Sequence, residues 1–246
     1  KKIKKFIDHI LLLFSFEKPY FDKEQVSCEF VGHPLLESKK NDMIDINQLV
    51  RRNKALISIF AGSRVTEINV LMPILLNFIK LMANKYNDIT FVFHSTREHS
   101  ELIKSYFKKS SLTNCEIVSD EKIKLYLLKK SVFAIAKSGT VSLEICNAKI
   151  PSIILYKMNF INFFIIRMLV KIKFANIINF AANEEIIPEL LQSKCNAKNI
   201  YKVLNEFLDT PTKITEQISK TEIILNRFKT DKSSSELASE ALNKFV

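Results

Sequence analysis

Residues 55–67 read ALISIFAGSRVTE, and this stretch contains the pattern that decides the fold. The apolar run Ala55 to Phe60 leads into a glycine turn at Gly62, and a helix-length segment begins at Glu67. A strand that passes through a short turn into a helix is the repeating unit of a parallel sheet wound with helices.

The same unit recurs along the chain. The expected strands are Ala55 to Phe60, Ile89 to His94, Glu116 to Val118, Val132 to Ala136 and Ser152 to Leu155, and the expected helices between them are Glu67 to Lys85, Arg97 to Lys109, Glu121 to Lys129 and Thr140 to Ala148. The order βαβαβαβαβ predicts an α/β fold with a Rossmann-like, doubly wound parallel sheet.

The flanking segments have a different character. Strand-like runs lie at His9 to Phe16 and Cys28 to Val31, and the polar stretch Glu37 to Asn41 is typical of a linker. After Pro211 the chain is polar and helical, with Ile214, Ile218, Leu225 and Phe228 spaced along one apolar face. We therefore predict a remnant of a preceding domain and a hinge in 1–45, the Rossmann-like domain in 46–210, and a C-terminal helical segment in 211–246 that packs back on the first domain or on a partner.

Composition restricts the possible partners. The chain has 246 residues and a net charge of +11, which favours anionic partners such as phosphates, nucleic acid or an anionic bilayer. Its four cysteines are far apart in sequence, so we expect neither a zinc site nor a disulfide framework, and we expect a reducing, cytoplasmic compartment. No secretory signal opens the chain, and Met158 to Val170 is shorter than the roughly 20 apolar residues that cross a bilayer, so we expect no membrane span.

The chain contains only three glycines, Gly32, Gly62 and Gly139. In so glycine-poor a chain, we expect each to lie where no side chain is tolerated. Gly62 and Gly139 each follow a predicted strand and open a predicted helix, which places them at the carboxyl edge of the sheet. A helix amino terminus there offers unpaired N–H groups and a positive dipole end, so we predict a phosphate-binding site.

The first of these turns is Ala61-Gly62-Ser63-Arg64. Ser63 adds a hydroxyl, and the Arg64 guanidinium can pair bidentately with a diphosphate and stabilise a departing nucleotide. The alternative is a tight turn with Arg64 facing solvent, and the motif favours the two interpretations equally.

The second turn, Ser138-Gly139-Thr140, follows the apolar strand Val132 to Ala136. Glu144 comes one helical turn after Thr140, where its carboxylate could accept hydrogen bonds from two ribose hydroxyls while the loop holds a phosphate. Alternatively, Thr140 is an ordinary N-cap and Glu144 a first-turn partner of the helix dipole. Neither turn has the pattern of a P-loop or of a dinucleotide fingerprint.

Taken together, the motifs resemble the lipid-A-disaccharide synthases, glycosyltransferases with two Rossmann-like domains (GT-B type). The landmarks, in order, are Asp8-His9 leading to Phe16-Glu17, Phe30-Val31-Gly32-His33-Pro34-Leu35, Gly62-Ser63-Arg64 with Glu67-Ile68, Ser138-Gly139-Thr140 with Leu143-Glu144, and Pro188-Glu189-Leu190-Leu191-Gln192. The series covers nearly the whole chain and thins after about residue 205.

The resemblance implies a transferase of lipid A biosynthesis. It would move 2,3-diacylglucosamine from its UDP donor to the 6-hydroxyl of 2,3-diacylglucosamine 1-phosphate, form the β-1,6 disaccharide and release UDP. It implies inversion without a metal or other cofactor, with Arg64 as the catalytic cation and a cytoplasmic location, peripheral on the inner membrane. The donor would contact Gly62, Ser63, Arg64, Ser138, Gly139, Thr140, Glu144 and Asn179.

The chain also departs from the family pattern. Ala61 stands where a proline is usual, Lys137 where a small residue is usual, and Ile177-Ile178-Asn179 where the family has Leu-Pro-Asn. The family's first domain, with the acceptor site and the proposed base, would precede Lys1. The alternative function is therefore a non-catalytic nucleotide-sugar-binding fragment that needs a separate N-terminal domain. The expected protein partner is that separate domain or a second copy of the chain in a homo-oligomer. Nucleic-acid binding is poorly supported, because the cations do not interleave with aromatics in a recognisable motif.

Two further features have a functional and a structural interpretation. Lys157 to Lys173 combines phenylalanines with cations and could rest on an anionic bilayer, or it could pack against the sheet or a second subunit. His94 and His99 suggest a metal site only weakly, because no Cys or carboxylate accompanies them at suitable spacing. His33 could touch the site or hold a turn, and we expect His9 to be structural.

Overall fold

The computed structural model describes residues 3–37, 55–86, 88–158 and 173–245. The chain divides into two compact units, Asp42–Thr221 and Lys1–Asn41 with Glu222–Val246. One boundary between these units falls between Thr221 and Glu222, within the residues of helix α9 (Pro211–Asn226). The predicted linker lies mostly outside the described residues.

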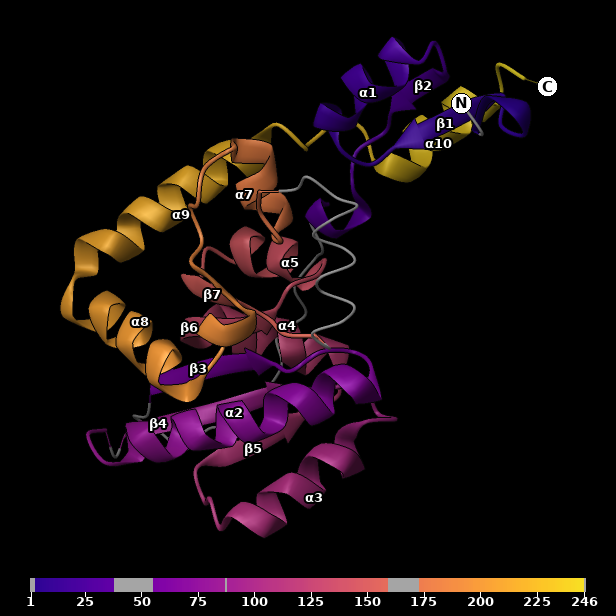
Figure 1. The fold of residues 1–246 in the computed structure, drawn as a ribbon. Helices are drawn as coiled ribbons and strands as arrows, with labels where there is room; N and C mark the ends of the chain where they lie inside the picture. Colours follow the sequence, from indigo (N-terminus) through magenta and orange to yellow (C-terminus); the bar gives the residue numbers. More distant parts are fainter. Residues whose placement is uncertain (1–2, 38–54, 87, 159–172, 246) are drawn as a thin grey trace. The chain divides into compact units, whose positions relative to one another are not determined.

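The larger unit is built on a six-stranded parallel sheet (Figure 1). The strands are β3 (Ala55–Phe60), β4 (Ile89–His94), β5 (Cys115–Val118), β6 (Ser131–Lys137), β7 (Ser152–Tyr156) and β8 (Glu189–Leu191), in the spatial order β5-β4-β3-β6-β7-β8. The chain thus winds outward from β3 in one direction and then, from β6, in the other. The predicted Rossmann-like α/β fold is confirmed, and β8 is a strand that the sequence analysis missed.

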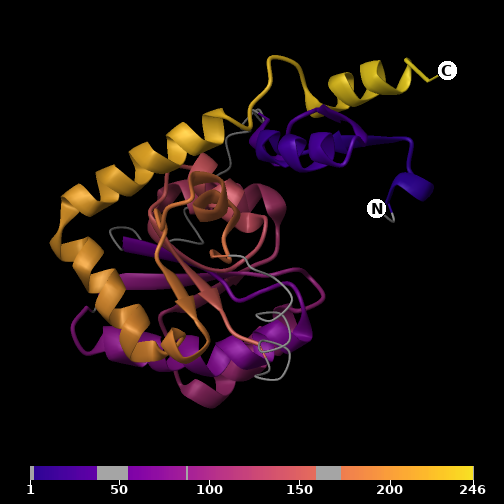
Figure 2. The same ribbon diagram turned by 45° about the horizontal axis from the view of Figure 1, so that its top comes forward.

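Helices cover both faces of this sheet. On one face, Ile57, Ile59, Phe91 and Phe93 pack against α2 (Val65–Ala83) in the main core. This core also includes residues of α3 (Ser100–Ser110) and α8 (Ala197–Asp209), and α8 lies beside α2 in both ribbon views (Figures 1 and 2).

On the other face, Leu56, Val92 and Val118 pack against Leu127 of α4 (Glu121–Lys130), and α5 (Val141–Asn147) covers β6. Alternate residues of each strand therefore point to opposite helical layers.

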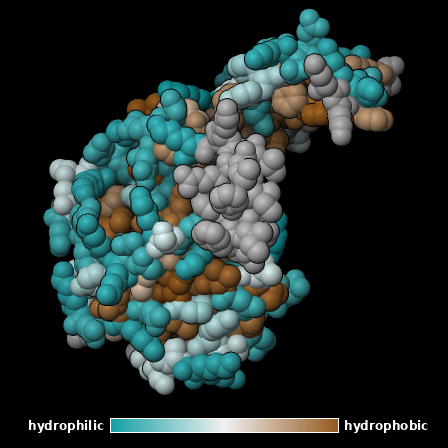
Figure 3. All heavy atoms as spheres, viewed as in Figure 1, coloured by the Kyte–Doolittle hydropathy of each residue, from teal (hydrophilic) through white to brown (hydrophobic). Residues whose placement is uncertain are grey.

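Helix α2 is long and apolar enough to cross a bilayer by length and composition alone. In this fold its apolar face is buried against the sheet through Ile68, Leu71, Met72, Leu75, Leu76, Phe78, Ile79 and Met82. Hydrophilic residues cover much of the visible surface of this unit, with hydrophobic residues gathered in patches (Figure 3). This burial pattern is that of a core helix in a globular domain.

Strand β8 forms one edge of the sheet, beside β7. Helix α7 (Ile177–Ala182) begins at Asn176, whose side chain accepts hydrogen bonds from the N–H groups of Ile178 and Asn179. Gln217 of α9 pairs with both backbone groups of Ser152, at 2.6 Å to its N–H and 3.1 Å to its carbonyl, and so fixes the start of β7. The segment Lys157 to Lys173, which could rest on a bilayer or pack against the sheet or a second subunit, lies almost entirely outside the described residues.

The smaller unit pairs β1 (His9–Leu12) with β2 (Ser27–Phe30) in parallel, joined through α1 (Lys18–Lys23), and ends in α10 (Ser234–Leu242). The first strand is shorter than the predicted His9 to Phe16, because a 3-10 turn forms at Ser15–Glu17 and the Glu17 carboxylate accepts the Phe14 N–H at 3.1 Å. Gly32 has a φ of +80°, and an added Cβ would lie 2.9 Å from the Thr230 hydroxyl. Glycine is therefore required at Gly32, as expected.

Candidate functional site

The site lies where the winding of the sheet reverses. Strands β3 and β6 are neighbours, and each continues past its carboxyl end into a glycine turn and a helix. Ligands bind at such a reversal because the two turns diverge there and leave a crevice. A cavity of about 210 Å³ occupies this crevice, lined by Gly62 and Ser63 of the first turn and by Ser138, Gly139 and Thr140 of the second. The structure thus brings both predicted turns to one cavity.

The first turn requires its glycine. Gly62 has a φ of +114°, which side chains rarely adopt, and an added Cβ would lie 2.7 Å from both Cβ and Oε2 of Glu67. The Glu67 carboxylate folds back over the turn and accepts the Ser63 N–H at 3.1 Å. Helix α2 therefore partly caps itself, since a carboxylate in its first turn satisfies a backbone donor.

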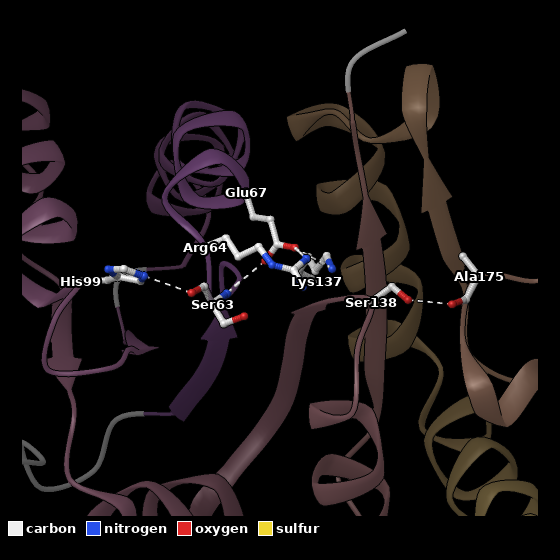
Figure 4. Close-up of polar contacts among 7 residues, drawn as sticks. All are labelled: Ser63, Arg64, Glu67, His99, Lys137, Ser138 and Ala175. Carbon is white, nitrogen blue, oxygen red and sulfur yellow. Dashed lines mark hydrogen bonds and ion pairs between the residues drawn. The ribbon is translucent and has the colours of Figure 1, made fainter. Parts of the chain in front are cut away.

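Glu67 also holds two cations (Figure 4). Its Oε1 lies 2.9 Å from Lys137 Nζ and 3.2 Å from the nearest guanidinium nitrogen of Arg64. Burial alone would raise the pKa of Glu67, but the hydrogen bond and charge of Lys137, the Ser63 N–H and the charge of Arg64 together lower it below 4.5. Glu67 therefore stays ionised and anchors the cations beside the turn.

The two cations differ in position. Lys137 lines the cavity and its side chain is 21% exposed, whereas the Arg64 side chain is 76% exposed and is not among the residues that line the cavity. The sequence shows the Arg64–Glu67 spacing on one helix, but the approach of Lys137 comes from a strand 70 residues further on and only the fold reveals it.

His99 holds the first turn from its other side. Its Nε2 pairs with the Ser63 carbonyl oxygen at 3.0 Å, and His99 stands at the start of α3 (Figure 4). Among the residues that the structure describes, no group of three or more His, Cys, Asp or Glu side chains is placed to hold a metal ion.

The second turn is fixed by a distant segment. The Ser138 hydroxyl donates to the Ala175 carbonyl at 2.7 Å (Figure 4). The Ser138 N–H donates to the Leu155 carbonyl at 2.9 Å. Gly139 was expected to lie where no side chain is tolerated, and the contacts of the described residues show that this expectation is wrong. Its φ lies outside the left-handed region, and the nearest described atom to an added Cβ is the Lys137 carbonyl oxygen at 4.0 Å.

Thr140 is at the N-cap position of α5, but its side chain makes no capping hydrogen bond. The alternative role of Thr140 as an ordinary N-cap is therefore not realised in this structure. Its side chain is exposed at the cavity edge and is available to a ligand.

Glu144 is paired with a cavity lysine that the sequence analysis did not name. Lys124 Nζ lies 3.0 Å from a Glu144 carboxylate oxygen and 3.0 Å from one of Glu121. Burial would lower the pKa of Lys124, but hydrogen bonds and charges from Glu121 and Glu144 raise it. Lys124 lines the cavity, and Glu144 stands behind it.

Asn179 was expected to contact the donor, but its side chain is buried and hydrogen-bonded to other residues of the chain. It is fully buried, its Nδ2 donates to the Ile187 carbonyl and to Glu189 Oε1 at 2.7 and 2.8 Å, and its Oδ1 accepts the N–H groups of Ile186 and Ile187 at 3.0 and 2.9 Å. Because both donors and both acceptor positions are in use, Asn179 shapes the segment before β8 and has no free group for a ligand.

The comparisons with known proteins agree with this geometry. A profile of the lipid-A-disaccharide synthetase family matches residues 1–243. The lipid-A-disaccharide synthase of Rickettsia prowazekii (strain Madrid E) is 33% identical over 245 residues, covering 98% of this chain and 64% of that protein. The Rickettsia typhi enzyme is 34% identical with the same coverage. This chain thus spans less than two thirds of the length of these curated relatives.

Solved structures show the same fold. A structure of S. aureus MnaA with UDP has a TM-score of 0.69 at 15% identity, covering 99% of this chain and 61% of that one. The glycotransferase of kitacinnamycin has a TM-score of 0.60 at 13% identity, covering 95% of this chain and 54% of that one. With a profile match along nearly its whole length and the Rossmann-like fold of the C-terminal half of a GT-B glycosyltransferase, the chain belongs to the lipid-A-disaccharide synthetase family.

Proposed function

We propose that this chain is the donor-binding half of an enzyme that transfers 2,3-diacylglucosamine from UDP to 2,3-diacylglucosamine 1-phosphate, forming the β-1,6 lipid A disaccharide and releasing UDP. One observation carries the proposal: both glycine turns line a single cavity at the point where the sheet reverses. Family membership supports the reaction, and the 64% coverage of the R. prowazekii relative leads us to assign only the donor half to this chain.

The diphosphate of the donor would lie at the first turn. The amino end of α2 points its dipole there, and the glycine at Gly62 leaves the backbone accessible. Lys137 and Arg64 are already held at this end by Glu67, so each needs only to turn from a carboxylate oxygen to a phosphate oxygen. Two cations and a helix end would stabilise the charge that develops on departing UDP.

The nucleoside would lie toward the second turn. Ser138, Gly139 and Thr140 line that side of the cavity. The nearest described atom to an added Cβ at Gly139 is 4.0 Å away, so a ligand could approach the backbone there. Ribose hydroxyls would take the place of the Lys124 ammonium on Glu144, which is held at 3.0 Å in the free protein. No cofactor is needed for this arrangement to stabilise the leaving group.

We assign neither the acceptor, the acylated glucosamine 1-phosphate, nor the general base to the described residues of this chain, and a separate N-terminal domain is one source that would supply them. The acylated substrates would bring the enzyme to an anionic membrane surface on the cytoplasmic side, and a net charge of +11 favours such a surface. A second candidate function is a nucleotide-sugar-binding fragment that transfers nothing by itself, since the described cavity accounts for donor binding alone.

The test is calorimetric titration of the chain with UDP beside a transfer assay with both acylated sugars. We expect UDP to bind, and Lys137→Ala to weaken binding about tenfold or more, because a hydrogen bond between charged groups contributes about 1.5–3 kcal/mol. Lys80→Ala, an exposed position near the other end of α2, is the matched control and should bind like the wild type. Absence of UDP binding contradicts the proposal, and binding without turnover favours the fragment.

A further inference from the structure

His94 is a cavity residue with an unusual environment. It ends β4 on the same face of the sheet as α4, lines the cavity, and is only 5% exposed. Its ring stacks on Phe60, another cavity residue, with centroids 4.4 Å apart and planes 9° from parallel. The ring is therefore held in one orientation, so its two nitrogens have fixed and different surroundings.

A chain of hydrogen bonds determines which ring nitrogen carries the proton. The Ser131 hydroxyl donates to the Leu127 carbonyl at 2.9 Å, because a carbonyl oxygen can only accept. Ser131 must then accept from the Ser58 hydroxyl, 2.7 Å away. Because the Ser58 hydroxyl hydrogen is already donated to Ser131, Ser58 must accept a hydrogen bond from His94 Nε2 at 2.8 Å. The chain thus fixes His94 as the tautomer with the proton on Nε2.

The other nitrogen, Nδ1, is consequently a bare acceptor. It is buried, and among the described residues it has no hydrogen-bond partner. Burial lowers the pKa of His94 to about 3, and the charge of Lys124 acts in the same direction, so the ring is neutral at pH 7. A buried acceptor without a partner is uncommon in folded proteins, and because His94 lines the cavity, a ligand that brings a donor could satisfy this atom.

This acceptor selects among the parts of a nucleotide. A diphosphate diester at neutral pH presents oxygens with lone pairs and no hydrogen. It cannot donate a hydrogen bond to Nδ1, and the two acceptors would repel each other. The nucleoside carries the matching groups, an imide N–H on the base and hydroxyls on the sugar. The neighbouring Ser95 and Lys124 also line the cavity and are only partly buried, so they can move aside to admit a nucleoside.

We propose that His94 Nδ1 accepts a hydrogen bond from an N–H or O–H of the nucleoside part of the ligand. The inference rests on the proposed function, since it assumes a uridine nucleotide in this cavity. It orients that ligand: the diphosphate lies at the Gly62 turn, and the nucleoside lies in the part of the cavity that His94, Phe60 and the second turn line together. Ser58 and Ser131 act as positioning residues, because they hold the tautomer that leaves Nδ1 free.

The test compares UDP with three modified ligands, N3-methyl-UDP, 2′-deoxy-UDP and 3′-deoxy-UDP, by calorimetry on the wild type and on His94→Phe. The phenylalanine keeps the stack on Phe60 and removes the acceptor. We expect one of the three ligands to bind the wild type about tenfold more weakly than UDP, which identifies the donor atom. We expect His94→Phe to bind UDP about tenfold more weakly and to lose that discrimination, whereas the matched variant His9→Phe in the smaller unit retains it.

Three results overturn the inference alone: equal binding of all four ligands, discrimination that survives in His94→Phe, or undiminished UDP binding by that variant. Absence of UDP binding to the wild type overturns the proposed function together with the inference. Should His94→Phe fail to fold, ¹⁵N-histidine NMR of the wild type replaces it. The free protein should show an unprotonated Nδ1 whose resonance moves toward that of a hydrogen-bonded nitrogen when UDP is added, and an Nδ1 that is protonated or unmoved contradicts the inference.

Discussion

The turn at Gly62 closes on its own helix, whereas the turn at Gly139 is tied to a segment far along the chain. In the first, Glu67 caps the Ser63 N–H and crowds the space where a Cβ would stand. In the second, the Ser138 hydroxyl donates a hydrogen bond to the Ala175 carbonyl, and the nearest described atom to an added Cβ at Gly139 is 4.0 Å away. The contacts of the described residues therefore explain the first glycine but not the second.

The comparison extends to what holds each turn. The first depends on a local carboxylate and two cations. The second depends on the segment 175–189, where Glu189 accepts the N–H groups of Ala175 and Asn176 at 2.8 and 3.0 Å and a hydrogen bond from Asn179. Substitutions at the two turns should differ in whether they change folding stability, ligand binding or both.

The largest effect is expected for Asn179→Ala. The change leaves the N–H groups of Ile186 and Ile187 without their acceptor and removes a donor from Glu189, in a setting that is partly buried at Ile186 and buried at the other two. Each unsatisfied buried group costs about 1–3 kcal/mol, so we expect the free energy of unfolding to fall by about 2–5 kcal/mol. Urea denaturation measures this, with the exposed Asn226→Ala as the control. A loss as small as that of the control would mean that the segment is not held as described.

Gly62→Ala should come next. The new Cβ would require a left-handed residue and displacement of Glu67, at a cost of about 1–3 kcal/mol in the free energy of unfolding. UDP affinity should fall as well, because the same displacement disturbs Lys137. Urea denaturation and calorimetry on one preparation test both effects. Unchanged stability would contradict the strain inferred at this turn.

Glu67→Gln should remove the contribution of the Glu67 carboxylate to the pH dependence of the free energy of unfolding. The folded pKa of Glu67 lies below its ordinary 4.5, so its ionised form stabilises the fold at pH values above 4.5, and this stabilisation is lost as the pH falls through the lowered value. The wild type should be the more stable at pH 7, and the difference should shrink as the pH is lowered below 4.5. Thermal denaturation across this range is the measurement, and a difference that grows in acid would reverse the assigned sign.

The smallest effect on stability is expected for Gly139→Ala. With the nearest atom 4.0 Å from the new methyl group, the free energy of unfolding should change by no more than about 0.5 kcal/mol. UDP binding should nevertheless weaken, since the methyl group enters the side of the cavity assigned to the ligand. Calorimetry beside urea denaturation separates the two effects. Full UDP affinity in this variant would remove the second turn from the binding site.

Much of the fold could be predicted from the sequence, since β3 and β4 begin and end at the predicted residues. Gly62 and Gly139 line one cavity, as expected of two turns that follow parallel strands at the carboxyl edge of a sheet. The strand β8 was missed because it is only three residues long, and its first residue, Glu189, is a buried carboxylate whose partners lie earlier in the chain. Lys124 and His94 were not assigned to the site because they reach it from separate elements, and only the packing of α4 over β4 reveals their proximity.

The carboxylate of Glu67 acts as an internal competitor for the ligand. In this structure the carboxylate already pairs with Lys137 and Arg64, the two cations that an incoming anion needs. That anion must therefore displace a negative charge that is part of the chain itself. A singly charged anion such as chloride gains little by this exchange, whereas a diphosphate can contact both cations at once. Glu67, which closes the first turn, would thus make the site select multiply charged anions over singly charged ones.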